Sequence, residues 1–585
     1  MLYFCNRKLD KQNNAFHFLN KEYTIVMAYN LDTSMVKSFS KIIEKSVIKY
    51  WDTPALSDFQ GRTLQFKDVA RKIEKLHILF EQAGLKPGDK IAICGRNSAN
   101  WAVTFIASVT YGAVTVPLLA DFTPEQIHNT VNHSDAKLLF VGDYVATIID
   151  ATQMPNLEGI FYLPDFSIVE SKSEKLIEAR EHLNELFGRK FPKYFRKENV
   201  CYYEDTDPNA MCLINYTSGT TGFSKGVMIP YRAMWSNLEF AMKTMNKCLH
   251  PGENYISMLP LGHMFGIAFE LVFPFVAGRH IHFLNRTPSP QVLLKAYSEI
   301  KPTLVISVPL VIEKIIRKKV FPKIHTLKMQ ALLHTPVVKN KVKEKIREQV
   351  MNAFGGNFFE LIVGGAAFNK EVENFLRDEK IPYCVGYGAT ECAPLIAYAH
   401  WMDIVPGSCG RPCDNIEVEI DSTDPRNIPG EILVRGLNVM LGYYKAEEQT
   451  RQALDEDGWY HTGDLGIMDE EGFITIKGRS KNMLLSANGQ NIYPEEIEDR
   501  LNNMELVVES IVVQRANKLI GLVFPDYDEA KKQGMSKENI EAVMEQNRVK
   551  LNESLPVYSK IFKIETTDVE FAKTAKRSIK RFMYK

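Results

Sequence analysis

The stretch MCLINYTSGTTGFSKG, residues 211–226, decides the fold. It begins with the apolar run MCLIN and continues at once into a loop rich in glycine and hydroxyl side chains, which is typical of a strand that ends at an anion-binding loop. Glycines let the backbone approach an anion closely, and Lys225 adds positive charge. The hydroxyls that would donate to phosphate oxygens belong to Thr217, Ser218, Thr220 and Thr221, and the glycines between them are Gly219 and Gly222.

This loop differs from the phosphate loop of P-loop nucleoside triphosphatases. That motif places its lysine directly after the second glycine, whereas Lys225 lies three positions after Gly222. A glycine- and serine-rich surface turn is the ordinary alternative. The density of glycines and hydroxyls, together with a lysine, favours phosphate binding.

Apolar strand-like runs and amphipathic helical patterns alternate on both sides of this loop. The runs include residues 90–95, 136–142, 302–308 and 358–365. Alternation of uniformly apolar strands with helices predicts an α/β fold, in which parallel sheets are covered by helices on both faces. Residues 101–120 carry no charge and have the length of a membrane span, but Gly112 and Pro117 interrupt them. A buried helix followed by a buried strand is therefore expected there.

The pattern changes twice towards the C-terminus. Residues 408–478 read as short strands separated by turns, which predicts a small β-rich subdomain. We expect it to close a large domain over residues 27–478. A small, mobile α+β domain is expected over 479–585, after a hinge at 479–482. Residues 1–26 have no convincing signal-peptide pattern and are expected to be a disordered tail, or to precede a start at Met27.

Composition narrows the class of function. Lys plus Arg and Asp plus Glu are both 71, and this balance argues against a general nucleic-acid-binding protein. The nine cysteines form no CxxC pair, which argues against a zinc site. Their irregular spacing suits free thiols in a reducing compartment. Residues 172–197 and 339–354 look helical and basic. A solvated helix face is the ordinary interpretation of both, and contact with anionic lipid is the alternative.

Two further clusters carry groups suited to a nucleotide. VGYGATECAP, residues 385–394, places Tyr387 between Gly386 and Gly388 as an aromatic plane for a purine, and Thr390 and Glu391 follow it. A hydroxyl and a carboxylate are hard oxygen ligands of the kind that Mg²⁺ prefers.

The other cluster is GWYHTGDLG, residues 458–466, followed by IKGRSKN, residues 476–482. Asp464 can accept hydrogen bonds from two ribose hydroxyls, and Arg479 is a rigid donor for the sugar or the phosphate. Either residue alone would be read as a solvated side chain or a local salt bridge.

In their order and spacing, YTSGTTGFSKG, VGYGATE, WYHTGDLG and IKGRSKN resemble the motifs of the adenylate-forming (AMP-binding) superfamily. That superfamily contains acyl-CoA synthetases, peptide-synthetase adenylation domains and luciferases. The resemblance runs from about residue 51 to the C-terminus. GEILVRGLNVMLGYYK (430–445) and SANGQNIYPEEIE (486–498) are most similar to long-chain fatty acid–CoA ligases.

The resemblance implies roles for individual positions. Thr217 and Glu391 would hold Mg²⁺, and the loop through Thr220 and Lys225 would bind the β- and γ-phosphates. His263 would lie near the reacting carboxylate, and Lys481 matches the pivot of the mobile domain. The adenine and ribose would be bound by Gly364, Gly365, Ala366, Ala367 and Tyr387, and by Asp464 and Arg479. A satisfied core histidine is the alternative for His263.

The implied enzyme is an ATP-dependent, AMP-forming acid–thiol ligase with ATP, Mg²⁺ and coenzyme A as its cofactors and substrates. The acid attacks the α-phosphate and expels pyrophosphate, and the coenzyme A thiol then displaces AMP. A medium- to long-chain fatty acid is the expected acid, although its length is not readable from the sequence. Two alternatives remain open. One is an acyl-AMP ligase that loads an acyl carrier protein, and the other is a catalytically weak acyl or nucleotide sensor.

One departure from the family pattern affects the first step. Family members usually carry a C-terminal lysine in a pattern like PKTxxGKxxR, whereas this chain reads FAKTAKRSIKR, residues 571–581. Serine therefore stands at the lysine position, at Ser578. Lys576 and Lys580 lie two positions to either side and share its face if the segment is extended. Our hypothesis is that one of them substitutes, with Lys576 preferred. A cytoplasmic location with at most peripheral membrane contact is expected, and the oligomeric state is open.

Overall fold

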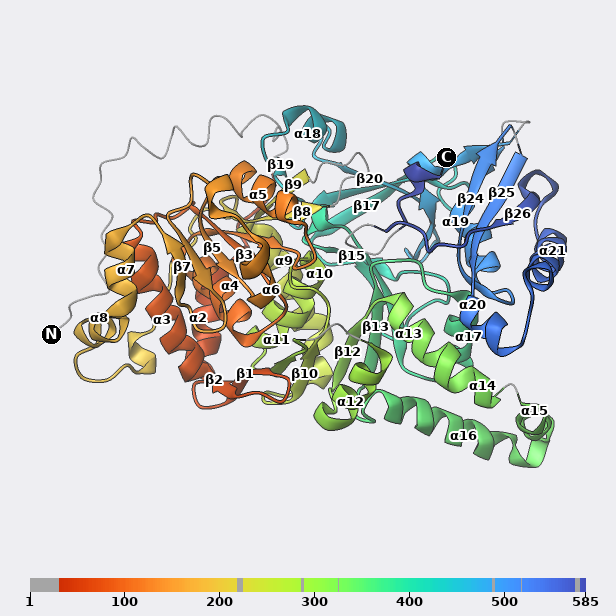
Figure 1. The fold of residues 1–585 in the computed structure, drawn as a ribbon, viewed down its shortest axis with the longest axis horizontal. Coiled ribbons are helices and arrows are strands. Elements are labelled where there is room, and N and C mark those ends of the chain that lie inside the picture. The colour runs from red at the N-terminus through yellow and green to blue at the C-terminus, as the bar shows by residue number, and fades with distance from the viewer. Residues whose placement is uncertain are drawn as a thin grey trace.

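The structure is a computed structural model that describes residues 31–217, 225–285, 289–324, 326–486, 490–516, 518–573 and 579–584. Its fold is α/β, which confirms the expected class. A large body contains two extended sheets flanked by helices, and the C-terminal segment forms a smaller α+β unit beside it (Figure 1). The predicted disordered tail, residues 1–26, lies outside the described residues.

The first large sheet has eight strands, and the predicted phosphate loop lies in the chain between two neighbouring strands, β8 (Met211–Thr217) and β9 (Lys225–Pro230). Its inner strands pair in parallel, whereas β9, β19 and β7 join it antiparallel. The inner strands are buried along most of their length, as expected for a sheet covered on both faces. In spatial order the strands are β19 (Gly442–Tyr443), β9 (Lys225–Pro230), β8 (Met211–Thr217), β4 (Val114–Leu118), β3 (Lys90–Cys94), β5 (Ala136–Val141), β6 (Gly159–Tyr162) and β7 (Ile168–Ser171).

Helices around this sheet come mainly from the N-terminal half of the chain. They are α2 (Phe39–Lys49), α3 (Phe66–Gln82), α4 (Ala99–Tyr111), α5 (Pro124–His133), α6 (Asp143–Ile148), α7 (Glu174–Glu181), α8 (Leu183–Lys190) and α9 (Tyr231–Thr244). The expected helix and strand within 101–120 are α4 and β4. They are separated by Gly112, whose φ of 86° is favourable only for glycine and whose added Cβ would lie 2.9 Å from the Tyr203 ring.

The second large sheet carries the predicted adenine segments. β12, β13 and β14 pair in parallel, and β15 and β16 extend the sheet antiparallel. In order the strands are β12 (Leu304–Ser307), β13 (Glu360–Gly364), β14 (Tyr383–Gly388), β15 (Leu395–Tyr398) and β16 (Arg411–Pro412). Helices near it are α10 (Met264–Gly266), the π-helical segment Ile267–Val272, α11 (Phe273–Val276), α12 (Pro290–Ile300), α13 (Pro309–Ile315), the π-helical segment Ile316–Val320, α14 (Phe321–Ile324), α15 (Leu327–His334), α16 (Pro336–Ala353) and α17 (Lys370–Asp378).

Smaller sheets complete the body. One of them has four strands in the order β10 (Asn254–Ser257), β11 (His280–Phe283), β1 (Pro54–Asp58) and β2 (Thr63–Gln65). The predicted β-rich segment forms an antiparallel sheet in the order β17 (Ile416–Asp421), β18 (Gly430–Gly436), β20 (Tyr460–Met468) and β21 (Ile474–Arg479), with α18 (Glu447–Ala453) between β19 and β20.

The C-terminal unit has hydrophobic clusters of its own. Its elements are β22 (Leu484–Leu485), β23 (Asn491–Ile492), α19 (Pro494–Leu501), β24 (Val507–Arg515), β25 (Lys518–Pro525), α20 (Tyr527–Lys532), α21 (Lys537–Glu553) and β26 (Ile561–Thr566). Polar contacts join α19 to β21 and to the segment after it. Lys477 Nζ lies 3.3 Å from Glu496 Oε1, and Asn482 Nδ2 donates to Glu495 Oε1 at 2.7 Å.

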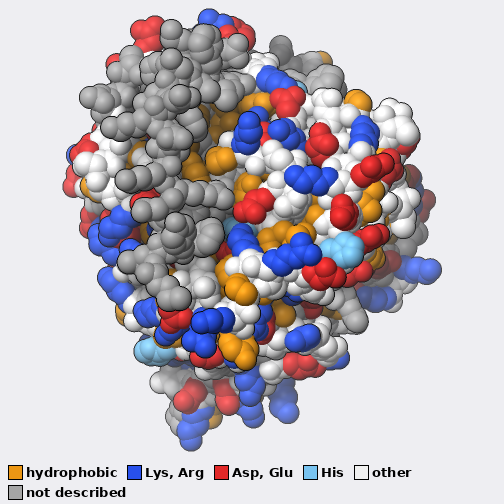
Figure 2. Space-filling model, turned by 90° about the vertical axis from the view of Figure 1, so that its left-hand side faces the viewer, with side chains coloured by type: hydrophobic (Ala, Val, Ile, Leu, Met, Phe, Trp, Pro, Cys, Tyr) orange, Lys and Arg blue, Asp and Glu red, His pale blue; other side chains and the backbone are white. Residues whose placement is uncertain are grey.

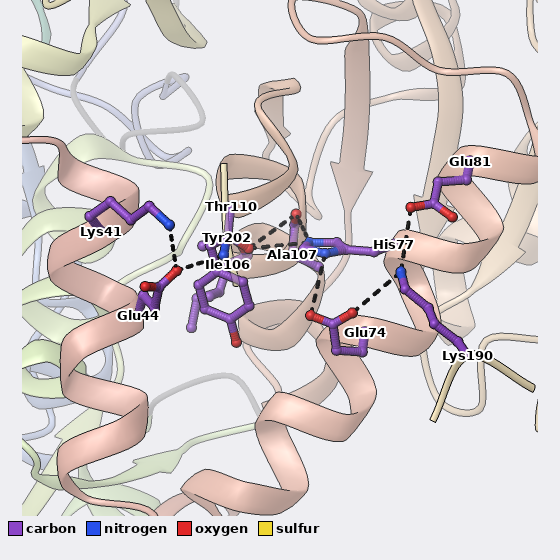
Figure 3. Close-up of polar contacts among 10 residues, drawn as sticks. All are labelled: Lys41, Glu44, Glu74, His77, Glu81, Ile106, Ala107, Thr110, Lys190 and Tyr202. Carbon is purple, nitrogen blue, oxygen red and sulfur yellow. Dashed lines mark hydrogen bonds and ion pairs between the residues drawn. The ribbon is translucent and has the colours of Figure 1, made fainter. Parts of the chain in front are cut away.

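A buried carboxylate lies where α3 meets α8, far along the chain from every motif above (Figure 3). Glu74 is 4% exposed, and its oxygens lie 3.6 Å from Lys190 Nζ and 3.9 Å from His77 Nδ1. Burial raises the pKa of Glu74 to about 7, although the neighbouring Lys190 opposes the rise. Glu81 also contacts Lys190, at 3.4 Å. The carboxyl group of Glu74 therefore has a pKa in the physiological range, although Glu74 belongs to no recognisable motif.

Charges of both signs are intermixed on the end of the molecule formed by the N-terminal half (Figure 2). This mixture fits the neutral overall balance of the sequence. Along the part of the chain that the structure describes, no helix combines the length and the apolar character needed to cross a bilayer.

Candidate active site

Asp464 and Arg479 lie opposite each other on neighbouring strands. β20 and β21 pair antiparallel with these two residues as partners, and Arg479 Nε lies 2.7 Å from Asp464 Oδ1. Tyr387 Oη donates to Asp464 Oδ2 at 2.7 Å. Burial raises the pKa of Asp464, and the charge of Arg479 and the Tyr387 hydrogen bond oppose that rise. A carboxylate has about four acceptor positions, so Asp464 retains capacity for sugar hydroxyls.

Glu391 and Lys225 both contact Tyr443. Tyr443 Oη donates to Glu391 Oε1 at 3.0 Å, and Lys225 Nζ lies 4.5 Å from the centre of the Tyr443 ring. Thr217 and Lys225 are register partners at the ends of β8 and β9, where the predicted phosphate loop leaves the sheet. The lysine and the carboxylate therefore flank one aromatic side chain at the end of the first sheet.

Lys481 links these two groups. Burial lowers its pKa, and the positive charges of Arg479 and Lys225 lower it further, whereas Asp464 and Glu391 act in the opposite direction. Four charged side chains from the other motifs thus lie close enough to influence Lys481. The structure brings together groups from Thr217, Lys225, residues 387–391, Asp464 and residues 479–481.

The expected adenine walls lie on adjacent strands. Gly364 at the end of β13 is the register partner of Gly386 on β14. Gly365, Ala366 and Ala367 follow and are exposed, which leaves this loop open to a planar ligand. Gly388 is required by a close approach, because a Cβ there would lie 2.2 Å from the Pro394 carbonyl oxygen. Thr390 is 9% exposed and begins the short 3₁₀ turn that carries Glu391.

The loop before His263 is held by three buried polar side chains from separate elements. Glu270 Oε2 accepts from the backbone N–H groups of Met258 and Leu259 at 2.8 and 2.7 Å. Asn97 Oδ1 accepts from Leu261 N at 3.0 Å, and Asn97 Nδ2 donates to Leu259 O at 2.7 Å.

Asn215, at the end of β8, donates from Nδ2 to the Gly262 carbonyl oxygen at 2.9 Å. These contacts fix the backbone that leads to His263, which is the N-cap residue of α10. Buried backbone groups in an irregular loop need such partners, so the loop position is strongly determined.

An apolar cavity of about 60 Å³ lies against Tyr387. It is also lined by Phe265 and Phe269, which follow His263 in the chain, and by the strand residues Ile306 and Ile362. Its remaining lining is Met245, Gly364, Gly365, Gly386, Gly388, Pro394, Leu395 and Tyr398, and none of these residues is charged. The cavity therefore suits an apolar group next to the nucleotide-binding residues.

Comparison with known proteins decides the family. The sequence pattern described as AMP-binding enzyme matches residues 43–444, and the pattern described as AMP-binding enzyme C-terminal domain matches residues 481–584. The chain belongs to the AMP-binding enzyme family. The resemblance inferred from the motifs is thereby confirmed.

Curated relatives of this AMP-binding enzyme share about a quarter of its residues. A long-chain-fatty-acid–CoA ligase of Escherichia coli O157:H7 is 27% identical over 511 residues, which is 82% of this chain and 83% of the relative. The ligase FadD15 of Mycobacterium tuberculosis is 28% identical over 80% of this chain and 79% of its own length. Human ACSBG2, also named a long-chain-fatty-acid–CoA ligase, is 26% identical over 78% of this chain and 72% of its own length.

Solved structures share the fold at lower identity. The anthranilate CoA ligase AuaEII in complex with anthranoyl-AMP has a TM-score of 0.74 at 21% identity, covering 93% of this chain and 96% of that one. ATP-bound MatB from Rhodopseudomonas palustris has a TM-score of 0.71 at 21% identity, covering 93% and 98%. These likenesses establish that the fold of this AMP-binding enzyme is that of known adenylate-forming proteins.

Several predicted site residues fall outside the described ranges. These are Ser218, Gly219, Thr220, Thr221 and Gly222 of the phosphate loop, and Lys576 and Ser578 of the C-terminal tail. Their roles stay predictions. On either side of the tail gap, Lys573 Nζ pairs with Glu509 at 2.8 Å, and the Lys580 backbone N–H donates to Ala572 O at 2.8 Å.

Sequence reasoning missed residues that the structure places in the site of this AMP-binding enzyme. Tyr443 lies in the quoted segment 430–445, yet only the fold shows that it contacts Glu391 and Lys225. Asn97 and Glu270 lie outside every motif recognised in the sequence. The side chains of the apolar cavity look like any other core residues in the sequence, so no local signal would have found them.

The charged groups of this AMP-binding enzyme fit a magnesium–nucleotide complex. Over the described ranges, no three His, Cys, Asp or Glu side chains gather into an all-protein metal site. Mg²⁺ bound to a nucleotide usually needs only one or two protein oxygen ligands in addition to phosphates. Glu391 and Thr217 carry oxygens of this kind, and Lys225 carries a charge of the sign that would offset a phosphate.

Proposed function

We propose that this chain is a fatty acid–CoA ligase, which activates a fatty acid with ATP and transfers the acyl group to coenzyme A. The observation that carries the proposal is the uncharged cavity lined by Tyr387 and by Phe265 and Phe269 of the segment that follows His263. An acid with a polar or charged tail would lose hydration in that cavity without gaining a partner, whereas a hydrocarbon tail gains from burial. The names of the curated relatives support the same acid class.

In the first step, an oxygen of the acid carboxylate attacks the α-phosphorus of ATP. The bond from that phosphorus to the bridging oxygen breaks, and pyrophosphate leaves with the electron pair. The chain contributes positioning and charge: Lys225 and the phosphate loop bind the leaving phosphates, and Asp464 and Arg479 hold the ribose. Mg²⁺, held by Glu391 and Thr217, would neutralise phosphate charge. The fixed loop before His263 presents the acid.

In the second step, the sulfur of coenzyme A attacks the acyl carbonyl, and the bond from that carbon to the AMP oxygen breaks. AMP leaves, and the thiol proton goes to solvent or to AMP. We propose that the segment from residue 479 to 482, including Lys481, is the hinge on which residues 479–585 move between the two steps over the large domain, residues 27–478. The polar contacts of Glu495 and Glu496 with that region would be exchanged in such a movement.

The size of the cavity constrains the acid. By comparison with the volume that one water needs, about 60 Å³ holds only a few methylene groups. A long acyl chain therefore requires a lining side chain to move. Phe265 and Phe269 are candidates, because their side chains can rotate without a movement of the backbone. We propose that this lining sets the chain-length preference.

The proposal is tested by offering ATP with fatty acids of graded length, with benzoate and with malonate, each first without and then with coenzyme A. We expect pyrophosphate release with the fatty acids and acyl-CoA only when coenzyme A is present. Faster turnover of benzoate or malonate than of every fatty acid would refute the acid class. A thioester formed only on acyl carrier protein would establish the carrier-loading alternative, and the absence of AMP with either acceptor would favour a sensor.

The C-terminal tail has a test of its own. Because Ser578 cannot supply the positive charge of the family lysine, we propose that Lys576, or else Lys580, supplies it during the first step. Loss of one such preorganised group typically lowers the rate about a hundred- to a thousandfold. Acid-dependent pyrophosphate release should fall to that extent in Lys576→Ala or in Lys580→Ala. Rates near wild type in both variants would contradict the substitution.

A further inference from the structure

A helical arm projects from the body below the C-terminal unit. It consists of α14, α15 and α16, and we call residues 321–353 apart from residue 325 the basic arm (Figure 1). The chain reaches it from β12, which carries Ile306 of the apolar cavity, through α13 and the π-helical segment Ile316–Val320. The basic arm is thus connected directly to the acid-binding half of the large domain.

Positive charge is concentrated on this arm. Residues 321–353 contain seven Lys and Arg residues and two acidic residues, Glu344 and Glu348, although the whole chain has no net charge. The end of the molecule shown in Figure 2 has no comparable separation of signs. Six of the seven basic side chains are exposed: Lys323, Lys328, Lys339, Lys341, Lys345 and Arg347.

Among the residues that the structure describes, acidic side chains neutralise little of this charge. Lys343 forms the arm's ion pair, 3.1 Å from Glu379 Oε1, and it also donates to the Asp378 carbonyl oxygen. Within the described ranges, Lys323, Lys328, Lys341 and Lys345 have no acidic partner. Unpaired cations of one sign on a projecting element create a local positive potential that attracts an anionic surface.

An aliphatic side chain stands in the middle of these cations. Leu327 begins α15 and is 92% exposed, between Lys323 and Lys328. Thr326 accepts from Met329 N at 3.3 Å and caps the helix, so the position of Leu327 is set by a defined turn. An exposed apolar side chain flanked by lysines matches surfaces that bind the interface of an anionic bilayer.

We propose that the basic arm docks on an anionic lipid leaflet, with its lysines at the headgroups and Leu327 at the hydrocarbon boundary. A nucleic acid would satisfy the lysines but offers no hydrocarbon for Leu327. Docking of the arm deepens the proposed function, because it holds the strand that carries Ile306 near a hydrocarbon phase. The docking itself does not depend on which acid is activated.

The test measures sedimentation of the full chain with vesicles of phosphatidylcholine alone and of phosphatidylcholine with phosphatidylglycerol in equal parts. We expect the wild type to bind the anionic vesicles and to be released by high salt, because surface charges are screened. The triple variant Lys323→Gln, Lys328→Gln, Lys341→Gln should have a partition coefficient roughly a hundredfold lower, because each lysine near an anionic leaflet contributes about fivefold.

A matched variant removes three exposed lysines from the opposite half of the chain: Lys45→Gln, Lys86→Gln, Lys175→Gln. It loses the same net charge and should bind anionic vesicles as the wild type does. Leu327→Ser should lower the partition coefficient severalfold at high salt as well, because the lost contribution is hydrophobic.

Three results would overturn the docking: no preference of the wild type for anionic vesicles, undiminished binding by the arm variant, or an equal loss in the matched variant. Binding to heparin or DNA without binding to the anionic vesicles would assign the arm to a polyanion instead, and would also overturn it. Pyrophosphate release with a short, water-soluble fatty acid reports the proposed function separately. A wild type that binds vesicles but activates no acid would leave the docking intact and refute the function.

Discussion

The two sides of Tyr387 differ in how they are built. Its hydroxyl donates to Asp464 on the nucleotide side, and the residue also lines the apolar cavity of the acid side. The nucleotide side is assembled from short contiguous motifs at the ends of paired strands. The acid side is assembled from single residues, such as Phe265, Ile306 and Ile362, on elements far apart in the chain.

This difference teaches which kind of site a sequence reveals. Charged and hydroxyl groups at strand ends are unusual in a core and therefore mark a function when they cluster. Apolar residues that line a cavity are of the same types as those that pack a core. The sequence therefore does not distinguish a binding residue from a core residue. The nucleotide side should therefore respond to loss of charge, and the acid side to change of volume.

The largest effect is expected at Glu391. Glu391→Gln removes the charge that would hold Mg²⁺ while keeping an oxygen that can accept from Tyr443, so acid-dependent pyrophosphate release should fall about a hundred- to a thousandfold. Tyr443→Phe keeps the charge and the ring beneath Lys225, and should lose only about tenfold. Equal rates for Glu391→Gln and wild type would remove the electrostatic basis of the nucleotide side.

The next effect concerns Glu270, which holds the backbone between the two sides. Glu270→Leu leaves the N–H groups of Met258 and Leu259 without their acceptor in a fully buried position, and should destabilise the protein by about 2–4 kcal/mol. Glu270→Gln keeps the acceptor oxygen. Burial already raises the pKa of the Glu270 carboxyl in the wild type, so removal of its charge should change the free energy of unfolding little.

Thermal unfolding and the rate of AMP formation, measured on both Glu270 variants, separate these outcomes. A rescue by Gln of both quantities would show that the hydrogen bonds position the loop that leads to His263. If Glu270→Leu were as stable as the wild type, the loop would be held by Asn97 and Asn215 alone.

Much of the fold could be predicted from the sequence, for physical reasons that also explain the omissions. β3, β5, β12 and β13 lie within the apolar runs quoted from the sequence, because strands buried on both faces must be continuously apolar. The partners of the loop before His263 could not be predicted. Asn97 and Glu270 are distant in sequence, and a single buried Asn or Glu has many uses other than holding a distant backbone.

Position 306 tests the acid side by volume. Ile306→Phe fills part of the cavity and should shift the chain-length preference towards shorter acids, whereas Ile306→Ala should shift it towards longer ones. Addition or loss of a methylene in an apolar pocket changes kcat/KM by about tenfold to a hundredfold. The KM for ATP should stay unchanged in both. A parallel change in the KM for ATP would show that the two sides of Tyr387 are not independent.

The smallest effect separates an active-site carboxylate from one that is merely buried. Asp464 and Glu74 are both buried beside a cation, and burial raises the pKa of both. Glu74 has a folded-state pKa of about 7, above its ordinary 4.5, so the folded state favours the protonated acid. Its contribution to stability is complete at low pH and is lost as the pH rises from about 4.5 to about 7.

Glu74→Gln removes this titration while keeping the shape of the side chain. Between about pH 5.5 and pH 7.5, the free energy of unfolding of the wild type should fall by about 2 kcal/mol more than that of the variant. Glu498, whose pKa burial also raises to about 7, is present in both proteins, so the difference isolates Glu74. Denaturant unfolding at the two pH values measures this difference.

Pyrophosphate release should be the same in both proteins, because Glu74 contacts Lys190 and His77 and none of the nucleotide-side groups. A loss of activity in Glu74→Gln comparable to that in Glu391→Gln would mean that burial and charge alone do not distinguish the two kinds of carboxylate.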